Sequence, residues 1–250
     1  MKFANISAIT WIELWKKVQP YAEKSDNVEQ VAQKFIDVIY DEFEESLALA
    51  RLFLSVPYDD LPTFNRNFVK NLAGQLNIES ELTSTTPVLS LLGTRGNEPE
   101  WNDRRQSQGH LGIPLVSPEF VDTIPMVSRL LNQLGLGLDW ISMPNEKFSI
   151  QTQSQTQLDI TGTFLVQDAK NDRNAQNRRI IPMQDFVADY NVKTVFGFGG
   201  RYLVGKKSVI AGIFFSKETL TIETLKKLSP IIKPFKVSTM KLFKKNKVFY

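Results

Sequence analysis

The side chains best suited to chemistry gather in residues 94–112, TRGNEPEWNDRRQSQGHLG. Arginine binds carboxylates and phosphates through paired hydrogen bonds, and polar loops held on a rigid scaffold often carry function. We therefore predict a ligand-binding or partner-binding site in this segment. Its expected members are Arg95, Arg104 and Arg105 for pairing with an anion, Trp101 for stacking on a flat ligand, and Asn102 and His110 for hydrogen bonding.

The same residues also fit a purely structural role. Asp103, Glu98 and Glu100 could pair with the arginines and fasten a long loop to the sheet, with Trp101 as a packing plug. The sequence leaves both interpretations open. His110 could act in acid–base chemistry or bind haem, but a lone histidine beside a glycine more often forms hydrogen bonds within a loop.

Other chemistries find little support in the sequence. The chain has no cysteine, which excludes disulfides, thiolate metal sites and cysteine nucleophiles, and its one histidine makes a metal site improbable. The run GFGG at 197–200, followed by Arg201, lacks the strand-to-helix spacing of a phosphate-binding loop. We retain Arg201 as a secondary ligand-binding candidate, identify no cofactor and expect no enzymatic activity.

Charge is distributed unevenly along the chain. The formal net charge is +3, but residues 226–250 contain eight lysines and no acid. The rest of the chain has 22 basic and 27 acidic residues and is therefore slightly acidic. A specific nucleic-acid binder usually carries its basic face on the fold itself. We expect residues 241–250, KLFKKNKVFY, to form a solvated strand or frayed end, or else to touch an anionic membrane or nucleic acid non-specifically.

The chain reads as one cytoplasmic domain with no transmembrane segment and no secretory signal. Apolar spacing and turn residues predict an alternation of helices and strands. The expected helices are 8–22, 27–45, 63–76, one from Ser117 through Leu134, and one from Thr221 onward. The expected strands are 47–55, 87–93, 136–150, 158–167, 192–199 and 208–216, the last two forming a hairpin around 205–207.

The closing segment, from YNVKTVFGFGG to SVIAGIFFSKETLTIETLKKLSPIIKPF, resembles the end of a GAF domain. The segments GTRGNEPEWNDRRQSQGHLGIPL and IPMVSRLLNQLGL resemble GAF-like sensory regions found beside bacterial histidine kinases. The resemblance implies an α/β fold of the α+β type, with a GAF/PAS-like antiparallel sheet flanked by helices and an N-terminal helical extension. It divides the chain into the extension (1–26), a sensory domain (27–235) and a Lys-rich tail (236–250).

The chain also departs from several relatives of that family. A histidine kinase needs a phosphoacceptor histidine on a helix, whereas His110 lies in a predicted loop. Bilin-attaching and methionine-sulfoxide-reducing relatives need cysteine, and the Asn-Lys-Phe-Asp-Glu signature of cyclic-nucleotide binders is missing. We therefore expect a non-catalytic regulatory domain that binds a small molecule or a signalling partner such as a histidine kinase. The alternative is a structural homodimer with a vestigial pocket, held together by the terminal helices with Trp11 and Trp15.

Overall fold

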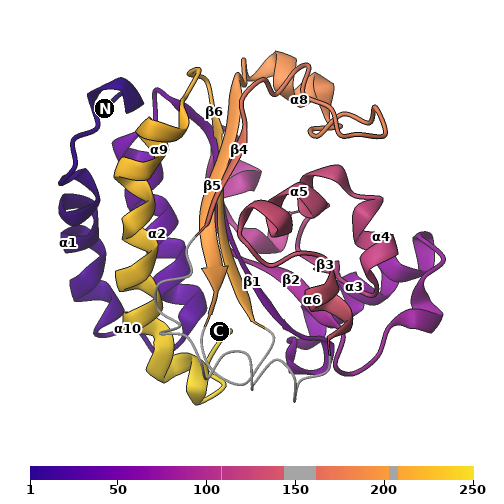
Figure 1. Cartoon of the computed structure of the whole chain (residues 1–250). Helices are drawn as coiled ribbons and strands as arrows, with labels where there is room; N and C mark the ends of the chain where they lie inside the picture. The colour runs from indigo at the N-terminus through magenta and orange to yellow at the C-terminus, as the bar shows by residue number, and fades with distance from the viewer. Residues whose placement is uncertain (108, 144–161, 203–207) are drawn as a thin grey trace.

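A computed structural model describes residues 1–107, 109–143, 162–202 and 208–250. Its centre is a six-stranded antiparallel sheet with the strand order β3-β2-β1-β6-β5-β4. The strands are β1 (Leu47–Pro57), β2 (Pro87–Gly96), β3 (Gly112–Pro114), β4 (Gly162–Val166), β5 (Thr194–Arg201) and β6 (Val209–Ser216). Helices cover both faces, so the predicted α+β architecture of an antiparallel sheet flanked by helices is confirmed (Figure 1).

One face of the sheet carries a helical layer made from the two ends of the chain (Figure 1). This layer, which we call the terminal-helix layer, contains α1 (Thr10–Ala22), α2 (Val28–Glu42), α9 (Ile222–Leu228) and α10 (Ile232–Lys244). The stripe of α2 that was expected to be apolar, including Val31, Phe35 and Ile39, is fully buried against the sheet. Gly93 on β2 permits this close packing, because a Cβ there would lie 2.7 Å from the carbonyl oxygen of Ala32.

The opposite face carries shorter helices, which form the second layer (Figure 1). They are α4 (Pro118–Asp122), α5 (Pro125–Gln133), α6 (Asp139–Ser142) and α8 (Gln184–Asp189). Helix α3 (Thr63–Gln75) instead covers the β3 edge of the first face, where Val69 joins the core shared with α2. A separate apolar core fills the space between most of these helices and the sheet, with Phe53, Leu91, Leu131 and Trp140 among its buried members. The alternation of side chains along each strand therefore decides which core a residue joins.

Several predicted elements are interrupted in the structure. The single helix expected from Ser117 to Leu134 is wrong: Pro125 starts a new helix, because proline disfavours helical backbone in the residue before it. The strand expected over 136–150 is also wrong where it is described, since 139–142 form α6. Residues 144–150, 158–161 and the hairpin turn 205–207 lie outside the described residues.

The C-terminal end differs most from expectation. Thr221 caps α9 as predicted, but the helix then passes through a turn at Ser229–Ile231 and continues as α10 to Lys244. Residues 247–250, which we call the strap, lie against the start of α2: the backbone N–H groups of Val28 and Glu29 donate to the carbonyls of Lys247 and Val248 at 2.9 and 2.8 Å. A solvated strand or frayed end over 241–250 is therefore wrong.

Candidate functional site

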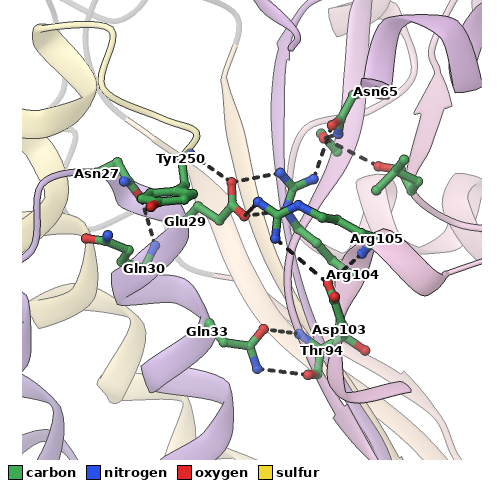
Figure 2. Close-up of polar contacts among 12 residues, drawn as sticks. Asn27, Glu29, Gln30, Gln33, Asn65, Thr94, Asp103, Arg104, Arg105 and Tyr250 are labelled. Carbon is green, nitrogen blue, oxygen red and sulfur yellow. Dashed lines mark hydrogen bonds and ion pairs between the residues drawn. The ribbon is translucent and has the colours of Figure 1, made fainter. Parts of the chain in front are cut away.

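A groove of about 490 Å³ runs between α2 and the segment 102–105, beside the strap. Figure 2 shows the polar side chains that meet there from these three parts of the chain. The sequence analysis anticipated three of its lining residues, Asn102, Arg104 and Arg105. The other lining residues are Tyr21, Glu29, Gln30, Gln33, Lys34, Asp37, Leu92, Asp103 and Tyr250.

Arg104 forms the floor of the groove through a buried ion pair with Glu29. Its Nε donates to Glu29 Oε1 at 2.6 Å and its Nη2 to Glu29 Oε2 at 2.8 Å, a bidentate arrangement (Figure 2). Its Nη1 donates to Asn65 Oδ1 at 3.2 Å, and the ring of Phe249 lies 5.5 Å from the guanidinium carbon. Each of the three guanidinium nitrogens thus donates to a protein oxygen, and the side chain is only 4% exposed, which makes Arg104 a structural clamp.

The sequence places Glu29 where this clamp needs it. Asn27 caps α2 by accepting the backbone N–H of Gln30 at 2.9 Å, so Glu29 lies in the first turn. A carboxylate is favoured there by the helix dipole. Glu29 Oε2 also accepts the backbone N–H of Tyr250 at 3.0 Å, so one carboxylate joins α2, the loop and the strap.

Two basic side chains on the groove are less committed. Arg105 is about half exposed, and its nitrogens lie 3.6 Å from Glu29 and 3.9 Å from Asp103, beyond hydrogen-bond distance. Lys34 is partly buried and makes no ion pair within the described ranges. Asp37 faces the same groove, accepts Gln33 Nε2 at 2.9 Å and has its pKa raised by burial.

The other predicted residues lie outside the groove lining. Arg95 pairs with Asp41 at 3.7 Å on the far end of α2. Trp101 packs against Tyr190 and Phe186, with ring centroids 4.8 and 5.6 Å away, in the second layer. His110 precedes β3 with an exposed side chain, and Arg201 ends β5.

The loop contacts answer the question that the sequence left open for most of these side chains. Asn102 uses its Oδ1 to accept a hydrogen bond from the backbone N–H of Gly96 at 3.0 Å. Trp101 packs against other aromatic side chains, as the structural interpretation of the loop predicts. The acidic partner of Arg104 is Glu29 on α2, and not Glu98, which accepts the hydroxyl of Tyr190 at 2.7 Å. Of the loop residues predicted to bind a ligand through charge, only Arg105 is still available to pair with an anion.

The sequence analysis missed Glu29 and Lys34, because both read as the polar side of an amphipathic helix. It also missed Arg51, although a signal was present: this is the one charge in the apolar run LALARLFLS of β1. Within the described ranges, no helix is both long and apolar enough to span a bilayer.

Comparison with known proteins adds little. No protein-family model matches the chain, and no curated protein is similar to it. One solved structure, the far-red absorbing dark state of JSC1_58120g3 with bound biliverdin IXa, is similar to this chain. The match covers 95% of this chain and 99% of the chain in that structure. Its sequence identity is 9% and its TM-score 0.43, and we base no functional inference on it.

Proposed function

We propose that the chain is a non-catalytic regulatory domain that binds a small polar molecule in the groove beside α2. The observation that supports this most is Arg105, a half-exposed cation held above the rigid Glu29–Arg104 floor with donors that no carboxylate fully uses. Lys34 supplies a second cation from the opposite wall. Charged donors of this kind bind a carboxylate or phosphate strongly when they are pre-positioned.

The lining also limits the chemistry of the ligand. Glu29, Asp37 and Asp103 balance the three basic side chains Lys34, Arg104 and Arg105. A simple polyanion would therefore meet repulsion as well as attraction, whereas a molecule with both an acidic group and hydrogen-bond donors, such as an amino acid, matches both kinds of side chain. The groove contains no histidine or cysteine to serve in acid–base or nucleophilic chemistry, which supports binding over turnover.

A thermal-shift screen with amino acids, organic acids, nucleotides and haem tests this function. We expect at least one amino or organic acid to raise the Tm, and the double variant Lys34→Gln/Arg105→Gln to lose that rise while keeping the unliganded Tm. Lys70→Gln is the matched control, because Lys70 is an exposed lysine on α3 that pairs with Glu79 and does not line the groove. No response in the screen, or an equal response in the double variant, would contradict the groove as a ligand site.

A signalling partner such as a histidine kinase would receive the response. We place this contact on the terminal-helix layer, where Ile9 (56%), Ile12 (37%) and Val237 (51%) expose large apolar side chains. These exposed apolar side chains also support the second candidate function, a structural homodimer. Trp15 cannot contribute to either contact, because it is only 8% exposed and belongs to the core.

Solution mass distinguishes the two candidates. A structural homodimer predicts a salt-insensitive dimer that Ile9→Ser/Val237→Ser converts to a monomer, together with no ligand response. If the chain is a regulatory domain, a ligand should raise its Tm whether the protein is a monomer or a dimer in solution.

A further inference from the structure

A second group of polar side chains lies on the other face of the same strands, away from the groove. Arg51 sits in the middle of β1, and its neighbours two residues away, Leu49 and Phe53, belong to the apolar core beneath the second layer. Its partner across β6, Ile213, belongs to that core as well. Since side chains alternate along a strand, Arg51 points into this core.

Among the residues that the structure describes, none pairs with Arg51. Its Nε is buried without a hydrogen-bond partner, and within the described ranges its guanidinium makes no hydrogen bond or ion pair. Burial alone lowers the pKa of Arg51 to about 10. The Arg51 side chain is partly buried as a whole, whereas Arg104 is buried and paired with Glu29. A charge that loses part of its hydration without gaining a partner is unfavourable.

Thr94 stands directly opposite Arg51 on β2. Directly paired residues on one face of an antiparallel sheet have Cβ atoms about 5 Å apart. Thr94 is 1% exposed, and its Oγ1 is buried without a hydrogen-bond partner. A bulge between Leu52 and Phe53, one pair further along, interrupts the register, and bulges are frequent next to binding sites. A cation and a hydroxyl therefore lie side by side with unused hydrogen-bonding capacity.

His110 lies near enough to Arg51 to feel its charge. Although His110 is exposed as a residue, the atoms packed near its ring lower its pKa by desolvation, and the positive charge of Arg51 lowers it further. The imidazole is thus neutral at pH 7 and can donate one hydrogen bond without adding to the local positive charge. Because the chain has only this histidine, its resonances report on the surroundings of Arg51 without ambiguity.

We infer that Arg51 and Thr94 form a second binding site, separate from the groove, for the carboxylate or phosphate group of a small molecule. The guanidinium offers charged donors to the oxyanion, and the Thr94 hydroxyl adds one more. The apolar side chains around Arg51 shield part of the guanidinium from water and strengthen this interaction. Phe53, Leu91 and Ile213 would contact the uncharged part of the ligand.

The test uses Arg51→Met, which keeps the length of the side chain and removes the charge. In the absence of added anion, we expect this variant to be as stable as the wild type or more stable, because a partly buried charge without a partner is removed. We expect inorganic phosphate or acetate, at matched ionic strength, to raise the Tm of the wild type and to shift the His110 resonances. Both effects should fall by more than half in Arg51→Met and in Thr94→Val.

Arg129→Met is the matched control, because Arg129 is a partly exposed arginine paired with Asp172 at 3.5 Å. It should keep the full anion response. The shift of the His110 resonances separates this site from the groove, because His110 does not line the groove. A response to phosphate alone or to acetate alone identifies which anion the site takes. A large fall in the Tm of anion-free Arg51→Met would show that Arg51 already has a partner and would overturn the inference, as would an unchanged anion response in that variant.

Discussion

Gln33 on α2 holds both backbone polar groups of Thr94 on β2. Its Nε2 donates to the Thr94 carbonyl at 2.9 Å, and its Oε1 accepts the Thr94 N–H at 3.1 Å (Figure 2). The amide side chain thus takes the place of a strand partner beside the bulge. It also connects the two proposed sites, because Gln33 lines the groove while the side chain of Thr94 faces the other layer.

Gln33→Leu should destabilise the fold by about 1–3 kcal/mol, because it leaves a backbone N–H and C=O in a partly buried position without partners. Chemical denaturation measures the change in the free energy of unfolding. Gln19→Leu is the control, since Gln19 bonds Glu23 on the exposed side of α1 and its loss should change stability by less than about 0.5 kcal/mol. Equal effects of the two substitutions would show that the Thr94 contacts contribute no special stability.

The Glu29–Arg104 pair should behave as a unit. Glu29→Leu or Arg104→Met alone should cost about 3–5 kcal/mol, because each leaves the opposite charge buried and uncompensated. The double variant Glu29→Leu/Arg104→Met should recover a large part of that loss, since neither charge then remains. A double-mutant cycle in urea measures this coupling, and strictly additive single effects would contradict the clamp.

His110 should make stability depend on pH in the acidic range. Its pKa is about 4 in the folded chain against an ordinary value of 6.5, so the folded state binds its proton later than the unfolded state. The free energy of unfolding is therefore highest, as far as His110 affects it, above pH 6.5, and it decreases as the pH falls toward 4. Solvent screens part of this effect because the side chain is exposed.

An NMR titration of the single imidazole measures that pKa directly. Arg51→Met should raise it, since a nearby positive charge is removed. An unchanged pKa in that variant would show that the two side chains do not interact.

Gly93→Ala should destabilise the contact between β2 and α2. The added Cβ would lie 2.7 Å from the Ala32 carbonyl oxygen and 2.9 Å from its carbon, so the helix must shift, and overpacking of this kind typically costs about 1–3 kcal/mol. Gly109→Ala is the control, because nothing lies within 4 Å of a Cβ added there. The Tm of the two variants should differ clearly, and equal values would contradict the close packing.

Local patterns in the sequence predicted the elements whose periodicity is uninterrupted. The buried stripe of α2 and the hairpin strands β5 and β6 follow from spacing alone. The break at Pro125 was missed because apolar positions continue at helical spacing on both sides of it. Residues 139–142 were assigned to a strand because a short apolar run fits a strand or a buried helix equally well.

The site was predicted less completely, because its contacts join distant residues. Arg104 reads as a free loop cation until Glu29, 75 positions earlier, is brought to it by the start of α2. Arg105, its neighbour, has a different role only because it points outward. Arg51 was visible in the sequence as a lone charge in an apolar strand, but the lack of a partner is a property of the folded chain alone.

The strap makes the beginning of α2 depend on residues made more than two hundred positions later. Tyr250 and Glu29 are separated by 221 residues, and the same short segment supplies acceptors to the first N–H groups of the helix. During synthesis, the N-terminal half of the chain leaves the ribosome long before these acceptors exist. Contacts between residues that lie far apart in the sequence slow folding. We therefore expect the first turn of α2 to gain protection from hydrogen exchange only in the last step of folding, after the sheet has formed.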